Sequence, residues 1–269
     1  MKQTFFLLAI ALMFVACSKN TAGEENEPTT TSATFRLFPT LGIETTRAEL
    51  TMADMTDLWV YEGETELAHQ TSTDDDFGSP TITLDYGEHT LTIVASKAAE
   101  QAVTDGAWSC TKVSPTFGKV AGLTVSAKTK AVAATLEMMS GAFKVLIDDE
   151  IPTTAKTMEV KFTPYPRSLS LSDLTASGSE SYTYTIDVSS KAGKSNVSWN
   201  MYYLQAGEST VDVTVKDAAG SAIVSHSLSC SLNKGESNTL HGNFFGNGSG
   251  MDLSLATDYT KTNDYDLNE

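Results

Sequence analysis

The feature that most constrains the fold of this chain is a long succession of short strand-like runs separated by turn residues. The runs extend from residue 35 to residue 245, and in most of them apolar and polar side chains alternate. Alternation with a period of two is typical of strands that bury one face, and many short runs between turn signals predict a sandwich or a barrel. The frequent Val-Thr alternations also favour strands over helices. We therefore predict an all-β protein.

Residues 34–130 are predicted to form a first β-sandwich. Gly63 and Gly87 mark the turns of two hairpins within it. The Ala-rich residues 97–105 are compatible with a short helix between strands. The expected strands lie at residues 35–38, 58–61, 65–70, 81–85, 90–95, 108–113 and 123–127.

Residues 131–269 are predicted to form a second β-sandwich. Pro164, Pro166 and the Ser-rich residues 168–181 are expected to be a long connection, because proline is excluded from central strands. A last strand is possible at residues 251–259, and we expect the tail after it to be mobile. The other expected strands lie at residues 131–136, 142–147, 157–163, 181–188, 197–204, 210–217, 222–229 and 239–245.

The first residues have the features of a signal peptide. Lys2 precedes an apolar run at residues 5–15 that is too short for a membrane-spanning helix. The run ends in Phe14-Val15-Ala16-Cys17, which resembles the lipobox of bacterial lipoproteins. The resemblance implies that residues 1–16 are removed and that Cys17 is acylated and becomes the new N-terminus. Phe14 departs from the usual Leu, and the alternative is plain secretory cleavage near Ala16.

Residues 17–33 are predicted to be an acylated cysteine followed by a flexible tether. They are polar and carry Glu24, Glu25 and Glu27, so they cannot bury enough apolar surface to become ordered. Acidic residues soon after the acylated cysteine resemble the surface-export signal of Bacteroides-type lipoproteins. That resemblance implies a lipid-anchored protein on the outer face of the outer membrane.

The charge of the chain argues against nucleic acid as a partner. The net charge is −16, and removal of residues 1–16 takes away Lys2 and no acid, which leaves −17. No cluster of Lys or Arg offers a local basic surface. A strongly acidic surface repels phosphate backbones.

The sequence contains no recognisable catalytic or metal-binding motif. The four histidines stand singly and form no His-x-x-x-His pair. The sequence also has no Cys-x-x-Cys pair and no Gly-x-Ser-x-Gly nucleophile elbow. Residues 74–76 are three adjacent aspartates that lack the spacing of a calcium loop, so a solvated loop tip is expected. The acids at 148–150 are sequence neighbours, which rarely face each other as an acid-base pair. We predict no enzyme activity, no metal and no cofactor.

A group of aromatic residues leaves two alternatives open. The rings of Trp59, Trp108, Trp199, Tyr202 and Tyr203 lie in strand runs, where aromatic residues usually belong to the core. Exposed together, they would instead form a stacking platform for sugars.

The body of the chain also holds two distant cysteines. Cys110 and Cys230 either form a disulfide or are two small buried residues, and their spacing does not decide between these alternatives.

Several short segments in both halves of the chain resemble a known family. They are residues 58–61 (LWVY), 77–78 (FG), 84–89 (LDYGEH), 117–118 (FG), 141–145 (GAFKV), 148–152 (DDEIP) and 238–245 (NTLHGNFF). With them, the whole chain after the tether resembles the FimB-like fimbrial subunits of the Bacteroides-type fimbrillin superfamily.

The resemblance implies two tandem transthyretin-like (Greek-key) β-sandwiches in a lipid-anchored subunit that helps to build or anchor adhesive fimbriae. The implied partners are other fimbrial subunits, the outer membrane through the lipid at Cys17, and ligands on host or bacterial surfaces. In such fimbriae an Arg-specific protease removes an N-terminal strand from stalk or tip subunits, and a neighbour's strand fills the groove. Cleavage here would fall between Arg47 and Ala48, and the alternative is that Arg47 is an ordinary solvated residue. Anchor subunits are expected to keep the strand and the lipid. The alternative function is a glycan-binding lipoprotein of a polysaccharide-uptake system.

Overall fold

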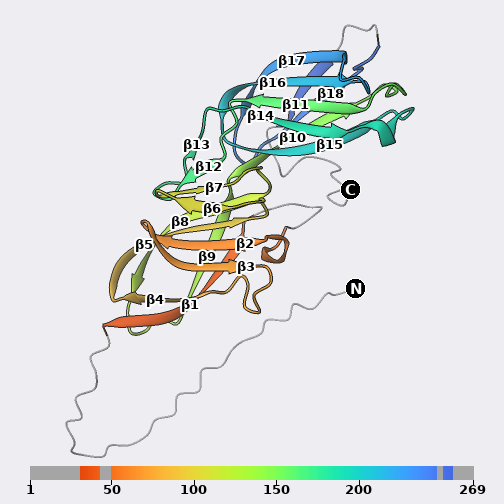
Figure 1. Ribbon diagram of the computed structural model, residues 1–269. Coiled ribbons are helices and arrows are strands. Elements are labelled where there is room, and N and C mark those ends of the chain that lie inside the picture. Colours follow the sequence, from red (N-terminus) through yellow and green to blue (C-terminus); the bar gives the residue numbers. More distant parts are fainter. Residues whose placement is uncertain (1–30, 43–49, 247–250, 257–269) are drawn as a thin grey trace, which may run out of the picture. The chain divides into compact units, whose positions relative to one another are not determined.

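A computed structural model of the chain describes residues 31–42 and 50–246 and the backbone of residues 251–256. These residues form an all-β structure, as predicted, in which the only helical segments are two three-residue 3-10 turns, η1 (Met52–Asp54) and η2 (Ser189–Lys191). Figure 1 shows the strands gathered into several sheets. By their contacts, the described residues belong to one compact unit. Within the described part, no helix has the length and apolar content needed to cross a membrane.

The first sandwich is built from a seven-stranded sheet in the order β3-β2-β5-β8-β9-β1-β4. Its neighbouring strands are antiparallel except for β1 and β9, which run parallel. The inward side chains, among them Phe35, Leu37, Leu58, Ile93 and Phe117, form one hydrophobic core. The strands are β1 (Ser32–Leu41), β2 (Asp57–Glu62), β3 (Thr65–Thr71), β4 (Thr81–Asp85), β5 (Gly87–Ser96), β8 (Thr116–Val125) and β9 (Ala131–Met138).

The second sandwich consists of two four-stranded sheets, β15-β10-β18-β19 and β14-β11-β16-β17. Their alternating inward residues, such as Phe143, Phe162 and Val213, belong to a second core. The predicted tandem β-sandwich fold is therefore confirmed. The strands are β10 (Ser140–Ile147), β11 (Thr157–Thr163), β14 (Tyr182–Asp187), β15 (Val197–Leu204), β16 (Gly207–Lys216), β17 (Ala222–Leu232), β18 (Ser237–Gly242) and β19 (Met251–Ala256).

A small fourth sheet joins the two halves of the chain. It has the order β13-β12-β7-β6, with β6 (Ala102–Thr104) and β7 (Ala107–Ser109) from the first half and β12 (Ser168–Ser170) and β13 (Ala176–Ser177) from the second. The hydroxyl of buried Thr92 on β5 also donates a hydrogen bond to the Leu171 carbonyl. The second core includes Trp59 and Trp108 from the first half, so the two halves share buried surface.

Four expectations from the sequence differ from the structure. The strands on either side of Gly87 form no hairpin with each other, because β4 pairs with β1 while β5 pairs with β2 and β8. Residues 97–105 form no helix, since they hold an isolated bridge at Ala99 and strand β6. Residues 168–181 are not simply a connection, because they supply two strands of the joining sheet. The run at 131–136, expected to open the second sandwich, lies in β9 and pairs with β1 of the first. Only Met139 separates β9 from β10, so no turn signal marks this change of sandwich.

Candidate functional site: the N-terminal strand and its slot

Strand β1 alternates strictly between buried and exposed residues. Ala33, Phe35 and Leu37 are buried in the first core, Pro39 is buried as well, and the residues between them are exposed. A strand with this pattern presents one apolar row to the core, and burial of a Phe or Leu side chain contributes about 1.5–3 kcal/mol each. The strand is therefore an integral part of the first sandwich.

The slot that holds β1 is formed by β4 on one side and β9 on the other. Residues Ser32 to Arg36 pair with Asp85 to Thr81 of β4, and Arg36 to Leu41 pair with Ala131 to Leu136 of β9. Side chains reinforce both pairings, and on the β9 side the hydroxyls of Thr40 and Thr135 lie 3.5 Å apart. The hydroxyls of Thr34 and Thr83 share a hydrogen bond of 2.8 Å. β1, the first strand of the described residues, thus pairs with β4 through its first half and with β9 through its second.

The backbone of β1 directs its hydrogen bonds in alternation to the two sides. The N–H groups of Arg36 and Gly42 donate to the carbonyls of Lys130 and Leu136 on the β9 side, at 3.2 and 2.8 Å. The N–H of Leu37 donates instead to Pro80, which precedes β4, at 2.9 Å. Since successive residues of a strand point in opposite directions, the N–H groups of even-numbered residues face β9.

Pro39 and Gly42 fit this arrangement. Pro39 has no N–H, and an N–H at this odd-numbered position would point away from β9, beyond the last pairing with β4. Proline is tolerated at such an edge position because no ladder bond is lost. At Gly42, an added Cβ would lie 2.9 Å from the Leu136 carbonyl oxygen and from Thr135 Cγ2, so only glycine allows this close approach to β9.

In the sequence, β1 lies between the two sites predicted for lipid attachment and for proteolysis. Cys17 precedes it, and Arg47 and Ala48 follow it. All three fall outside the residues that the structure describes. The structure thus describes the strand between the two sites, while lipidation at Cys17 and cleavage after Arg47 stay predictions.

The described residues bring no catalytic group of side chains together. Each histidine has a local polar partner: Asp57 Oδ1 for His69, Glu62 Oε1 for His89, the Phe244 carbonyl for His226 and Asp148 Oδ2 for His241. The short contact of 2.6 Å with Glu62 raises the pKa of His89 above its ordinary value. Within this part of the chain, no three His, Cys, Asp or Glu residues gather as a metal site.

One aspartate in each acidic cluster, residues 74–76 and 148–150, accepts hydrogen bonds from backbone N–H groups. The Asp74 carboxylate accepts the Thr71 N–H at 2.7 Å in the turn after β3. Asp149 accepts the N–H groups of Phe244, Phe245 and Gly246, at 2.9, 2.7 and 2.9 Å. It thereby fixes the chain where it leaves β18, a role that the sequence alone did not reveal.

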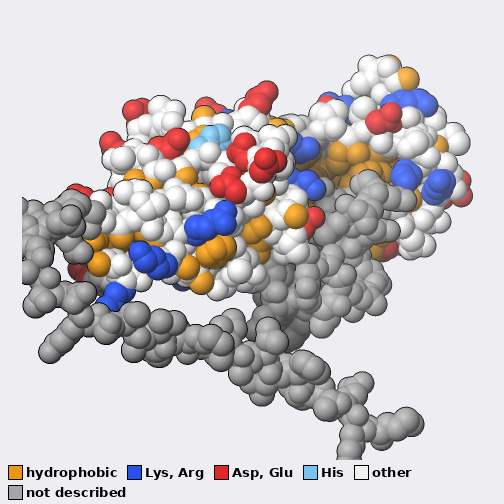
Figure 2. Space-filling view, turned by 90° about the horizontal axis from the view of Figure 1, so that it is seen from below, with side chains coloured by type: hydrophobic (Ala, Val, Ile, Leu, Met, Phe, Trp, Pro, Cys, Tyr) orange, Lys and Arg blue, Asp and Glu red, His pale blue; other side chains and the backbone are white. Residues whose placement is uncertain are grey.

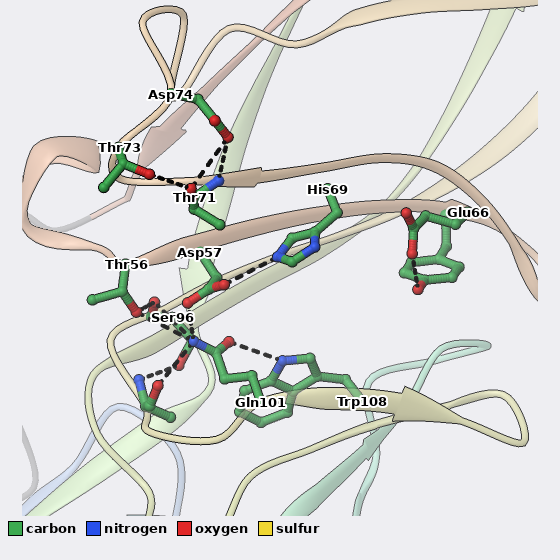
Figure 3. A network of polar contacts seen from close by, with 12 residues as sticks. Thr56, Asp57, Glu66, His69, Thr71, Thr73, Asp74, Ser96, Gln101 and Trp108 are labelled. Atoms are coloured by element: carbon green, nitrogen blue, oxygen red, sulfur yellow. Dashed lines mark hydrogen bonds and ion pairs between the residues drawn. The ribbon is translucent and has the colours of Figure 1, made fainter.

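A polar network lies at the junction between the first sandwich and the joining sheet. Figure 3 shows His69 directed toward Asp57, and the Trp108 indole toward Gln101. The Gln101 amide also donates to Asp57 at 2.7 Å. Trp108 is buried and Gln101 and Asp57 are half-buried, so these hydrogen bonds satisfy polar groups that water reaches only in part.

The aromatic residues considered for a sugar platform are mostly part of the core. Trp59, Trp108 and Tyr203 are buried, and Trp199 and Tyr202 are half-buried against the same core. A separate surface hollow of about 390 Å³ on the β14-β11-β16-β17 sheet is lined by charged and hydroxyl side chains and His226, with no Trp or Tyr. On the face seen in Figure 2, acidic and basic side chains both occur among polar and apolar ones.

Cys110 and Cys230 are both buried and unpaired, so the structure contains no bond between them. Burial raises the pKa of the Cys110 thiol to about 12 and that of the Cys230 thiol to about 11. Thiols with such values carry almost no reactive thiolate near neutral pH. The two residues act as small hydrophobic side chains.

Solved structures share this fold. No protein-family model and no curated protein matches the sequence. A candidate cell adhesion protein from Bacteroides ovatus matches with a TM-score of 0.50 and 12% identity, over 86% of this chain and 99% of that chain. A candidate adhesin from Bacteroides thetaiotaomicron matches with a TM-score of 0.50 and 11% identity, over 80% and 92%. The fimbrial anchor protein Mfa2 from Porphyromonas gingivalis matches with a TM-score of 0.46 and 11% identity, over 78% and 91%. At these identities the likenesses show the fold alone.

Proposed function

We propose that this chain is a non-enzymatic, lipid-anchored protein of the cell surface that serves as an anchor or accessory subunit of adhesive fimbriae. The observation that carries the proposal is the place of β1, which fills its slot in the first sandwich and stands between Cys17 and Arg47 in the sequence. The two structures of TM-score 0.50 come from proteins described as adhesion proteins, which agrees with a surface role.

A chain that keeps β1 has no room for a donated strand at that place. Both neighbours of β1 are already paired with it, and its apolar row is buried. Strand addition needs an open edge and an unfilled apolar groove. Retention of β1 would therefore end an assembly at this subunit, as an anchor requires, while cleavage after Arg47 would allow β1 to leave and a partner's strand to enter.

The lipid is the second part of the proposal. Acylation of Cys17 would hold the N-terminal side of β1 to the outer membrane through the tether predicted within residues 17–33. Under this account the fimbria is attached to the cell through one chain that runs from the lipid into the first sandwich.

The experiment is replacement of Cys17 by alanine in the native organism, with the amount of fimbrial stalk protein in the culture medium as the measurement. An anchor predicts that fimbriae are shed into the medium. An Arg47→Ala variant is the matched control, because an anchor that is not cut should retain its fimbriae. Fimbriae that stay on the cell in the Cys17→Ala strain would contradict the anchor role.

The glycan-binding alternative has less support from the described residues. It calls for Trp or Tyr rings exposed together, whereas three of the five candidate rings are buried. Titration of the purified protein with soluble polysaccharides tests it directly, and saturable binding would favour it over the fimbrial role.

A further inference from the structure

The direction of β1 relative to β9 has a mechanical consequence. These strands run parallel over six register pairs, from Arg36 with Ala131 to Leu41 with Leu136. The N-terminal end of β1 and the C-terminal end of β9 therefore lie at opposite ends of the paired segment.

Those two ends are also where the chain enters and leaves the first sandwich. The segment that carries Cys17 leads into β1 at Ser32, and β9 leads through Met139 into β10 of the second sandwich. The link from β9 through Met139 to β10 is the covalent connection between the two sandwiches. The joining sheet adds only non-covalent pairing between β7 and β12.

Tension between the N-terminal segment and the second sandwich would pull these two ends apart along the strand axis. Parallel strands pulled in this way slide past each other, so the hydrogen bonds between them are all stretched at once. The N–H groups of Arg36 and Gly42 already mark the two ends of this ladder, and those of Phe38 and Thr40 face β9 between them. If β9 were antiparallel, the same pull would separate the bonds one after another.

We propose that β1 and β9 form a mechanical clamp that holds the protein against tension applied through its N-terminal segment. The clamp rests on the proposed function only for the source of the tension, which is a membrane-held lipid at one end and a fimbria at the other. Packing supports the clamp from inside, because Leu37 on β1 and Leu136 on β9 both have no exposed surface. At the C-terminal end of β1, the Gly42 N–H donates the last hydrogen bond of the ladder to the Leu136 carbonyl.

Single-molecule force measurements on the mature, non-acylated chain test the clamp. One handle is attached to Cys17, and the second to a cysteine placed at Ala219, in the turn between β16 and β17, which pulls the clamp in the sliding direction. A second protein carries the cysteine at Asp85 instead. Asp85 pairs with Ser32 at the same end of β1, so this pull peels β1 away from β4. Cys110 and Cys230 are buried and do not compete for the handles.

The clamp predicts a rupture force several-fold higher for the Cys17–219 pair than for the Cys17–85 pair. Equal forces for the two pairs would overturn it, and this comparison needs no change within the clamp. In addition, Thr40→Pro removes one N–H that faces β9 and is expected to lower the sliding force. Thr40→Val keeps the N–H, gives up only the 3.5 Å contact between the Thr40 and Thr135 hydroxyls, and should change the force much less. A folded Thr40→Pro protein with an unaltered sliding force would also overturn the clamp. Neither measurement involves lipid or fimbriae, so the fimbrial proposal stands or falls on its own test.

Discussion

Replacement of Leu37 by alanine removes a fully buried side chain from the middle of β1. Leu37 belongs to the first core, next to residues contributed by β2, β5 and β9. Substitution of buried Leu by Ala costs roughly 2–5 kcal/mol, because transfer free energy is lost and a cavity remains. Since Leu37 is in a closed core with no access to solvent, we expect the free energy of unfolding to fall by about 3 kcal/mol.

Urea denaturation followed by circular dichroism measures this loss. With a slope of about 2–3 kcal/mol per M, the midpoint should fall by roughly 1–1.5 M while the slope stays the same. Thr40→Ala is the matched control on the exposed face of the same strand, where substitutions usually change stability by less than about 0.5 kcal/mol. If Leu37→Ala cost no more than Thr40→Ala, β1 would be a dispensable arm, and the argument for a filled slot would fail.

Three further predictions follow from the described contacts. Because the hydrogen bond with Glu62 raises the pKa of His89 in the folded protein, the stabilisation from this pair is fully present below the ordinary His pKa of 6.5 and is lost as pH rises through the raised value. Thermal unfolding between pH 5 and 9 should show this dependence, and Glu62→Gln should weaken it. Asp149→Ala leaves three backbone N–H groups without their acceptor, so we expect a loss of about 1–3 kcal/mol and faster hydrogen exchange at residues 244–246, and unchanged exchange would contradict the role assigned to Asp149. Cys110 and Cys230 should react with a thiol reagent at pH 8 only after denaturant is added, and rapid labelling of the native protein would show that they are not buried as described.

The local pattern of the sequence predicted most strands because many of them carry their own alternation. β4, β11 and β15 begin and end where the runs at 81–85, 157–163 and 197–204 were expected. Apolar and polar side chains take opposite faces of a strand whatever its neighbours are. Burial of most of the aromatic rings followed from the same rule.

Pairing between distant strands was beyond this kind of prediction. The run at 131–136 looks like its neighbours, and nothing local says that it pairs in parallel with β1, almost a hundred residues earlier in the chain. The Ser-rich residues 168–181 read as a connection because their two strands are only three and two residues long. Their partner, β7, lies in the other half of the chain.

The candidate site likewise has one part that the local sequence predicts and another that it does not. Its strand was visible at residues 35–38, whereas the slot formed by β4 and β9, the position of Pro39 and the close approach of Gly42 depend on the tertiary structure. Lipidation at Cys17 and cleavage after Arg47 stay predictions from the sequence.

The central claim is that the protein keeps β1 and is held by a lipid on its N-terminal side. Mass spectrometry of the protein purified from its native outer membrane, read at the N-terminus, tests this most directly. The account predicts a chain that begins at acylated Cys17 and continues uncut past Arg47. A chain that begins at Ala48 would contradict it, because β1 and the lipid would both have been removed.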